Sequence, residues 1–352
     1  MSLPPAPPRP ALPLPLPAPV RLPLPEELRL DPAEATTRIV MAIRGQVAEL
    51  GRRGVVLGMS GGIDSSVTAA LAARALGPAR VFGLFLPDAE SDPESLVTAR
   101  AVASALGIRH QREDITPALT ALGCYARRDA VIRTLVPGYG PGWGCKVCLS
   151  SQRLDSESLA VPLLAVQPPG GPVQRLRLPA AAYRELIAAT NFKQRVRKTI
   201  EYFHADRLHY AVLGTPNRLE YDQGFFVKGG DGLADLKPIA HLYKSQVYQL
   251  GEHLGLPDTV LQRAPTTDTW SLPQSQEEFF FGVPVAVLDR LLHAFAQGHP
   301  AAAAAERLGL TVAQVERVFR DIGQKRAATR HLHLPALLVS PVPLDGPDGR
   351  AG

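Results

Sequence analysis

The residues at positions 55–66, VVLGMSGGIDSS, have the types and spacing needed to hold a phosphate group. An apolar run is followed by two glycines, by Asp64, and by small hydroxyl residues that begin an alanine-rich helical pattern. Glycines let backbone N–H groups approach an anion closely, and the N-terminus of the next helix adds its positive dipole end. Neither the GK[ST] of a Walker A loop nor a GxGxxG follows. We therefore expect another kind of phosphate-binding loop, with an ordinary glycine turn as the alternative.

A second group of polar residues lies at positions 214–246, GTPNRLEYDQGFFVKGGDGLADLKPIAHLYKSQ. Five of the charged residues in this glycine-punctuated run are of interest: Glu220, Lys228, Asp231, Asp235 and Lys244. The run follows an expected strand at 210–213, and ligands of open parallel sheets collect beyond the carboxyl ends of the strands. Charged residues among glycines usually only solvate a loop. Because two strand ends converge here, we expect at least some of the five to face a nucleotide.

Strand and helix patterns alternate along most of the chain. Helical spacing is present at 28–51, from the glycine loop to Gly77, and at 96–106, with strand patterns at 55–58, 81–86 and 111–115. A long helix is expected after a polar N-cap at Asn191, leading to the strand at 210–213. Each connection between successive strands is long enough to contain a helix, as a connection between parallel strands requires. We therefore predict a doubly wound α/β fold with a mostly parallel sheet.

The section 116–189 breaks this alternation and is predicted to be an insertion on the sheet. It contains the turn signals PGYGPGWG and QPPGGP and an acidic, serine-rich patch at 150–158. Apolar runs at 160–166 and 173–178 flank the second turn and could form a hairpin.

The insertion also contains all three cysteines of the chain, Cys124, Cys145 and Cys148. A CxxC with one distant thiolate could hold an iron–sulfur cluster or act in sulfur transfer. A structural zinc would need a fourth ligand, such as His110 or His204. The interpretation that we favour is that the three are small buried residues.

Composition limits the class of protein. The 352 residues are 45% hydrophobic and 20% charged, which is typical of a globular chain with a substantial core. Eleven prolines in residues 1–25 exclude a continuous apolar signal helix there and predict a disordered tail over 1–28. We expect no transmembrane helix, and three cysteines fit a reducing cytoplasm. The net charge of +5 is compatible with nucleic acid and with nucleotide substrates alike.

From Gly58 to about Arg326, the sequence resembles the ammonia-dependent NAD synthetases of the N-type ATP pyrophosphatase superfamily. The resemblance rests on eight motifs in the same order: SGGIDSS, LPDAESDPES, NFKQRVR, LGTPNRLE, FFVKGGDGLADLKPI, YKSQV, APTTD and QKR. It implies the adenine-nucleotide α-hydrolase type of fold over 29–335. It also implies a two-step ligase reaction, in which a carboxylate attacks the α-phosphate of ATP and ammonia then opens the acyl-adenylate.

The resemblance assigns roles to individual residues. Asp64 and Glu220 would hold Mg²⁺, Lys244 would bind phosphate, and Asp231 would lie near the incoming ammonia. Oxygen ligands suit Mg²⁺, and a carboxylate near ammonium has a plausible acid–base task. The implied ATP contacts are Gly58, Met59, Ser60, Gly61, Gly62, Ile63, Asp64, Ser65, Thr215, Lys244 and Thr266. The implied contacts of deamido-NAD are Arg195, Lys228, Asp235, Gln324 and Lys325.

Three departures from the family pattern lie on the acceptor side: Pro216 after GT, Gln324 in place of a usual histidine, and the long insertion. With these departures, one alternative is that the chain belongs to a divergent branch of the family, which amidates another carboxylate. A tRNA sulfur transferase that uses the three cysteines, and a nucleotide-binding protein without catalysis, are further alternatives.

Two short helices joined at Gly309 could form a helix-turn-helix, but Val312, Val315 and Val318 favour packing over DNA reading. We therefore predict a helical cap over 284–330 that brings Lys325 and Arg326 over the site, and a polar tail over 336–352. The resemblance implies a cytoplasmic homodimer. Ammonia would come from solution or from a glutaminase acting in trans, and nucleic acid is not an expected partner.

Overall fold

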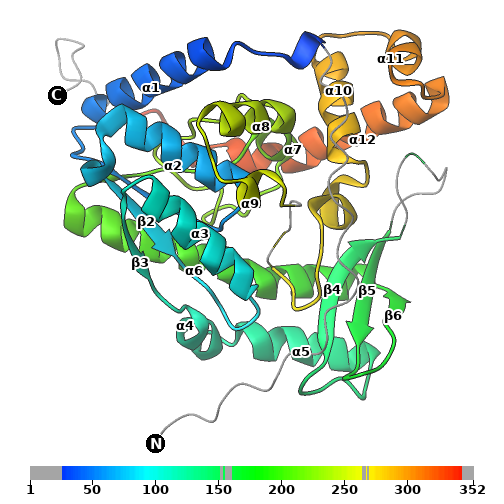
Figure 1. Cartoon of the computed structure of the whole chain (residues 1–352). Helices are drawn as coiled ribbons and strands as arrows, with labels where there is room; N and C mark the ends of the chain where they lie inside the picture. Colours follow the sequence, from blue (N-terminus) through cyan, green and yellow to red (C-terminus); the bar gives the residue numbers. More distant parts are fainter. Residues whose placement is uncertain (1–25, 151–153, 155–160, 264–266, 268, 343–352) are drawn as a thin grey trace, which may run out of the picture.

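The computed structural model describes residues 26–150, 154, 161–263, 267 and 269–342. Its centre is a parallel sheet of four strands in the order β3-β2-β1-β7, of which Figure 1 labels β2 and β3. The strands are β1 (Val55–Gly58), β2 (Val81–Phe85), β3 (Arg109–Arg112) and β7 (Ala211–Val212). This confirms the α/β prediction, although β3 begins before the expected range. Of the tail that was expected over 1–28, residues 1–25 lie outside the described residues, whereas 26–28 form a 3-10 turn in which Leu28 is buried.

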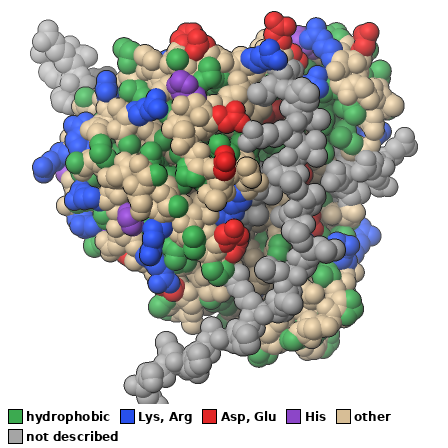
Figure 2. Space-filling view, in the orientation of Figure 1, with side chains coloured by type: hydrophobic (Ala, Val, Ile, Leu, Met, Phe, Trp, Pro, Cys, Tyr) green, Lys and Arg blue, Asp and Glu red, His purple; other side chains and the backbone are tan. Residues whose placement is uncertain are grey.

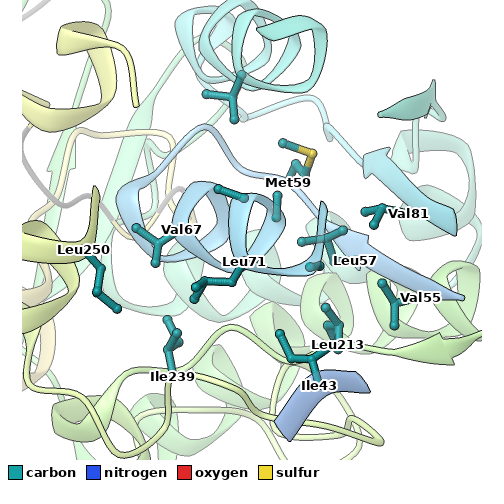
Figure 3. Close-up of a cluster of buried hydrophobic side chains, with 14 of the residues drawn as sticks. Ile43, Val55, Leu57, Met59, Val67, Leu71, Val81, Leu213, Ile239 and Leu250 are labelled. Carbon is teal, nitrogen blue, oxygen red and sulfur yellow. The ribbon is translucent and has the colours of Figure 1, made fainter. Parts of the chain in front are cut away.

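Helices cover both faces of this sheet. Val55 and Leu57 of β1 pack with α1 (Pro32–Glu49), α2 (Ile63–Leu76), α3 (Pro93–Ala105) and α8 (Lys244–His253), as Figure 3 shows for part of this cluster. Val56 points to the opposite face, where it packs with α6 (Ala180–Leu208). Alternate residues of a strand face opposite sides of a sheet, so a continuous apolar run such as VVL is typical of a strand that is covered twice.

The long helix α6 begins earlier than predicted. Asn191 was expected to be its N-cap, but α6 starts at Ala180 after Pro179, and Asn191 lies inside it. The physical reason is that residues 180–190 are mostly alanine, leucine and other good helix formers, which extend the helix without interruption. The expected end of the insertion, at residue 189, therefore falls within a continuous helix.

The insertion contains two helices and a second sheet. Helices α4 (Thr116–Ala121) and α5 (Cys124–Leu135) precede antiparallel strands β4 (Gly144–Leu149), β5 (Pro162–Gln167) and β6 (Gln174–Arg177). The predicted hairpin is confirmed as β5 and β6. The prediction missed β4, the strand that contains the CxxC. These elements surround a separate apolar cluster that includes Ile132, Leu164 and Leu186.

The C-terminal part is helical. After the short helices α7 (Arg218–Gln223) and α9 (Asp258–Leu261) come one π-helical turn, η3 (Glu277–Phe281), and α10 (Val285–Ala296), α11 (Ala301–Leu308) and α12 (Val312–His333). The second helix of the expected pair is thus long rather than short. Val315 and Val318 are buried as predicted, whereas Val312 is exposed.

Two short 3-10 turns, η1 (Glu26–Leu28) and η2 (Pro78–Arg80), complete the described elements. In the part of the chain that the structure describes, no helix combines the length and the apolar character needed to cross a membrane. On the face drawn in Figure 2, basic and acidic side chains are interspersed with apolar ones.

Candidate active site

The glycine loop joins β1 to α2 and borders a cavity of about 450 Å³ at the carboxyl end of β1. Gly61 has a φ of +76°, and a Cβ there would lie only 2.5 Å from the carbonyl oxygen of Ser95. Only glycine fits this position. The hydroxyl of Ser65 donates to the carbonyl of Gly62 at 3.1 Å, so the loop is braced by its own side chains. The N-cap of α2 is Gly62, which provides no capping side chain, so the first N–H groups of this helix suit an anion.

Two carboxylates and a lysine converge beside this loop. The ammonium group of Lys244, the first residue of α8, forms an ion pair with Asp64. Glu220 of α7 also borders the cavity, and its Oε1 accepts a hydrogen bond from Gln276 at 2.8 Å. Asn217 connects the two acids: its amide side chain donates to Asp64 Oδ1 at 3.2 Å, and its backbone N–H donates to Glu220 Oε2 at 3.1 Å.

The charges of this group perturb one another. Removal from water, and then the charge of Asp64, raise the pKa of Glu220 to about 7. Burial alone would lower the pKa of Lys244, but Asp64 and Glu220 raise it overall, so this lysine is cationic at neutral pH. Two acids with one lysine leave net negative charge, which is the setting in which a divalent cation binds.

The C-terminal helices hold Lys244 in place. Asp289 of α10 is fully buried, and its carboxylate accepts the backbone N–H groups of Lys244 at 3.2 Å and Ser245 at 2.7 Å. A side chain from another helix thus caps the N-terminus of α8. Burial raises the pKa of Asp289 to about 6, although these N–H groups act in the opposite direction.

The end of the cavity near Glu220 and Gln276 is aromatic and polar. Phe225 and Phe226 line it from the loop after α7, and Phe279 and Phe280 line it from η3. Asp231 also lines this end, and its Oδ1 accepts the backbone N–H of Val227 at 2.7 Å. The cavity therefore joins a phosphate-type loop, a group of charges and an aromatic wall with a carboxylate.

A model of the NAD synthase family matches residues 35–134 and 173–331. This chain belongs to the NAD synthase family. The NH(3)-dependent NAD(+) synthetase of Rhizobium rhizogenes is 57% identical over 318 residues, which cover 90% of this chain and 96% of that relative. The NH(3)-dependent NAD(+) synthetase of Thermotoga maritima is 33% identical and matches 72% of this chain and 84% of that relative. The family that the sequence motifs predicted is confirmed.

Solved structures agree on the fold. An NH3-dependent NAD synthetase from Campylobacter jejuni superposes with a TM-score of 0.58 at 21% identity, covering 88% of this chain and 100% of that chain. An NMN synthetase from Francisella tularensis gives a TM-score of 0.61 at 24% identity, covering 88% and 99%. At this identity, the likeness shows the shared fold alone.

The segment 135–172, between the two parts matched by the NAD synthase family model, contains β4 and β5. The alignment with the R. rhizogenes relative leaves out fewer residues of this chain than this segment contains. That alignment therefore includes part of the segment. The long insertion is thus compatible with membership of this family, and it does not by itself indicate a different activity.

Most residues predicted to contact ATP or metal line the cavity of this NAD synthase family member. Gly61 is part of the loop but packs against Ser95 and does not border the cavity, and Thr266 lies outside the described residues. The predicted residues that border the cavity are Gly58, Met59, Ser60, Gly62, Ile63, Asp64, Ser65, Thr215, Glu220, Asp231 and Lys244.

The residues predicted to bind deamido-NAD do not line the cavity of the single chain. Asp235 accepts the backbone N–H of Val212 at 2.7 Å, and Arg195 donates to the carbonyl of Lys228 at 3.3 Å. The amine of Lys228 donates to the carbonyl of His331 at 2.9 Å, near the end of α12.

The two remaining predicted contacts of deamido-NAD lie on α12. Gln324 is exposed, and the amine of Lys325 donates to the carbonyl of Phe280 at 2.9 Å, behind the aromatic wall. Arg326 pairs with Asp222 at 2.6 Å. The helical cap therefore contacts the wall of the cavity without placing these cations inside it. Their role in binding the acid stays a prediction.

The cysteines do not form a common site. Cys145 and Cys148 are three residues apart on β4, so their side chains point to opposite faces of the sheet, and Cys124 donates to the carbonyl of Ala189 at 3.2 Å. All three are buried, and burial raises the pKa of each thiol, which opposes thiolate chemistry. Over the described ranges, no group of three or more His, Cys, Asp or Glu residues could hold a metal.

Sequence reasoning missed Asn217, Gln276 and Asp289. The spacing of Asn217 and Glu220 is that of a capping box, which the structure contains, and this signal could have identified Asn217 as an organising residue. Asp289 and Gln276 come from segments far along the chain, and no local pattern connects them with Lys244 or Glu220.

Proposed function

We propose that this chain is an ammonia-dependent NAD⁺ synthetase, which converts deamido-NAD, ATP and ammonia to NAD⁺, AMP and pyrophosphate. The observation that supports this most strongly is the single cavity that combines the SGGIDSS loop, Lys244 and the two acids with an acceptor end that contains Asp231. Relatives with 57% and 55% identity over 90% of the chain have the same named activity.

In the first step, the carboxylate of deamido-NAD attacks the α-phosphorus of ATP. A bond forms between this oxygen and phosphorus, while the bond to the bridging oxygen breaks and pyrophosphate leaves with the electron pair. The loop N–H groups and the Lys244 ammonium neutralise phosphate charge, which increases as pyrophosphate leaves.

Asp64 and Glu220 would hold Mg²⁺ with the phosphates. The fit rests on the oxygen donors of the two carboxylates, which both lie beside the cavity. Mg²⁺ commonly takes one or two carboxylates and completes its shell with phosphates and water. When bound, it supplies electrostatic stabilisation of the charge on the leaving pyrophosphate.

In the second step, ammonium gives one proton to Asp231, and the resulting ammonia attacks the carbonyl carbon of the acyl-adenylate. A C–N bond forms, and the C–O bond to AMP breaks, so AMP leaves with that electron pair. The nitrogen then loses its extra proton to solvent, and the amide of NAD⁺ is complete. Asp231 is half-buried in the cavity wall, where its Oδ1 accepts the backbone N–H of Val227, and a carboxylate at this place can act as a base.

We further propose that the enzyme is a homodimer. The cations predicted to bind deamido-NAD lie outside the cavity of one chain, so a neighbouring subunit would bring such groups together with the acid. Ammonia would come from solution or from a glutaminase acting in trans. The cytoplasm suits an enzyme that consumes ATP and has three buried, unpaired thiols.

The function is tested by incubating the protein with Mg-ATP, ammonium and deamido-NAD and measuring products by mass spectrometry. NAD⁺ and AMP should form in equal amounts, and Asp64→Asn should abolish both. AMP formation only with a different acid would overturn the substrate. Production of ADP and phosphate instead of AMP would overturn the reaction class.

A further inference from the structure

The short helix α7 lies between the cavity and the C-terminal helices. Glu220 of α7 borders the cavity, whereas Leu219 is buried in an apolar cluster that includes Val318 and Ile322 of α12. Asp222 follows Glu220 by two residues, so the two side chains project to nearly opposite sides of the helix. One side of α7 therefore belongs to the site, and the other side faces α12.

Arg326 of α12 holds the side of α7 that faces away from the cavity. Its guanidinium forms two hydrogen bonds with the Asp222 carboxylate, from Nε to Oδ1 and from a terminal nitrogen to Oδ2, each at 2.6 Å. The same guanidinium lies over the ring of Phe295 on α10, at 5.0 Å from the ring centroid. Two parallel charge-assisted bonds fix both the distance and the orientation of their partners.

The C-terminal end of α7 also packs directly on α12. Gly224 is the C-cap of α7 and has a φ of +70°, and a Cβ there would lie 2.3 Å from the Cβ of Thr329. The ring of Tyr221 lies against the ring of His333, with 4.8 Å between the centroids. These contacts are steric and aromatic, whereas the pair of Arg326 with Asp222 is directional.

The residue before Arg326 holds the other element that contacts Glu220. The amine of Lys325 donates to the carbonyl of Phe280 at 2.9 Å, in η3. Gln276, the N-cap of η3, donates in turn to Glu220 Oε1 at 2.8 Å. Consecutive residues of α12 thus hold the two elements that meet at Glu220. Arg326 acts on this carboxylate more directly than Lys325 does, because its partner lies on the same short helix as Glu220.

We propose that Arg326 is a positioning residue for the metal site, because its pair with Asp222 fixes the helix that presents Glu220 beside Asp64. This role rests on the proposed function, in which Asp64 and Glu220 hold Mg²⁺. Arg326 does not border the cavity, so the role requires no contact of its side chain with substrate or metal. Loss of the pair should weaken metal binding although every metal ligand is still present.

The test measures metal binding without turnover in the Arg326→Met variant. Mn²⁺, which suits the same oxygen ligands as Mg²⁺, is titrated by electron paramagnetic resonance into the complex of the protein with the unreactive analogue α,β-methylene-ATP. The dissociation constant of Mn²⁺ should rise by about tenfold, a usual loss when a group that orients a metal ligand is removed. In turnover, the Mg²⁺ concentration for half-maximal rate should rise by a similar factor, while KM for ammonium stays within about twofold of the wild type.

Variants of the pair distinguish positioning from a general loss of stability. Asp222→Asn should weaken Mn²⁺ binding as Arg326→Met does, and the double variant should bind no more weakly than either single variant, because the two side chains act as a unit. Arg326→Lys keeps the charge but not the two parallel bonds, so it should show an intermediate loss, and it carries the test if Arg326→Met does not fold.

The matched control is Arg290→Met on α10. Arg290 donates to the carbonyl of Arg307 at 3.1 Å, so this variant also removes an arginine contact between C-terminal helices. It should leave Mn²⁺ binding unchanged, because the contact does not involve α7. Urea denaturation of all variants shows which of them are folded under the conditions of the titration.

Unchanged Mn²⁺ binding in a folded Arg326 variant, additive losses in the double variant, or an equal loss in Arg290→Met would each overturn this inference while the proposed function stands. If the wild type binds Mn²⁺ and Arg326→Met weakens this binding, but the wild type forms no NAD⁺, the proposed function fails and the role of Arg326 stands. Absence of Mn²⁺ binding in the wild type would overturn the metal site, and this inference with it.

Discussion

At the scale of single residues, the site depends on one amide side chain. Asn217 is 1% exposed, caps α7 through its Oδ1, and joins Asp64 to Glu220. Two acids that repel each other are held together by donors from one residue. Each of these hydrogen bonds to a carboxylate is stronger than a bond between neutral groups.

Asn217→Ala removes the cap and the link to Asp64 together. We expect the free energy of unfolding to fall by about 1–2 kcal/mol, which is usual for loss of an N-cap. NAD⁺ formation should fall more than stability predicts, because Asp64 loses a donor that fixes its orientation. Urea denaturation and steady-state kinetics measure the two effects, and Asn217→Ser, which keeps a capping oxygen, should recover stability more than activity. Full activity in Asn217→Ala would contradict this account.

Glu220 makes stability depend on pH. Its pKa is about 7 in the folded protein and near the ordinary 4.5 in the unfolded chain, so the folded state binds its proton more tightly. The free energy of unfolding should therefore decrease as pH rises from about 4.5 to 7.

In Glu220→Gln, this decrease should be absent, and activity should be lost. Urea denaturation across this pH range measures the slope, with exposed Glu94→Gln on α3 as the control that keeps the wild-type slope. An equal slope in Glu220→Gln and wild type would show that Glu220 titrates normally.

At the scale of elements, α8 and α10 act together. The lysine that lines the cavity beside Asp64 is the first residue of α8, and the cap of that helix comes from Asp289 on α10. Because Asp289 lies on α10 and holds the start of α8, the C-terminal helices help to position a residue of the cavity. They therefore belong to the same unit as the cavity and do not form a separate DNA-reading module.

Asp289→Ala leaves two buried N–H groups without their acceptor, which costs about 1–3 kcal/mol for each unsatisfied group. We expect a lower midpoint of urea denaturation and a higher KM for ATP, since Lys244 loses its fixed position. The control is Asp258→Ala, at the exposed start of α9, which should change neither quantity appreciably. If Asp289→Ala lowered stability but left KM for ATP unchanged, this result would contradict a role of the cap in positioning Lys244.

Local patterns predicted the elements that bear the nucleotide part of the site. The apolar run at 55–57, the glycines that follow and the alanine-rich helix are short-range signals, and the sheet with its phosphate loop follows from them. The start of α6 was misplaced, since Asn191 is a good cap that sits inside a segment with enough helix formers to override it. β4 was missed because CKVC contains a charged residue and only a short apolar pattern.

At the scale of the whole molecule, the cavity lies where the sheet reverses its direction of growth. From β1 the chain adds β2 and β3 on one side, and after the insertion it returns to place β7 on the other. This is the switch point where open α/β sheets bind ligands. The insertion and the C-terminal helices then add walls from segments that no sequence pattern brings together.

A buried network connects α6 to the segment that follows β2. Lys193 of α6 is fully buried, and its amine donates to Asp88 Oδ1 at 3.1 Å, to Glu90 Oε2 at 2.7 Å and to the carbonyl of Thr269 at 2.9 Å. Burial would raise the pKa values of Asp88 and Glu90, but Lys193 and neighbouring arginines lower them overall. These acids therefore stabilise the fold at neutral pH, and this contribution is lost as the pH falls below their ordinary pKa values.

Lys193→Met should lower the free energy of unfolding at pH 7 by about 3–5 kcal/mol, because it leaves buried carboxylates without their cation. The difference from the wild type should shrink as the pH falls below about 4, where the unpaired acids become protonated. Urea denaturation measures both effects. In Arg112→Met, which breaks an exposed pair with Asp114, the loss should stay below about 1 kcal/mol. Equal losses in the two variants would contradict the network.

The central claim is that this cavity transfers the adenylyl group of ATP to the carboxylate of deamido-NAD. The most direct measurement uses deamido-NAD labelled with ¹⁸O in that carboxylate, Mg-ATP and ammonium, and follows the label by mass spectrometry. The account predicts one labelled oxygen in AMP and none in pyrophosphate. Label in inorganic phosphate, or NAD⁺ formed together with unlabelled AMP, would contradict it.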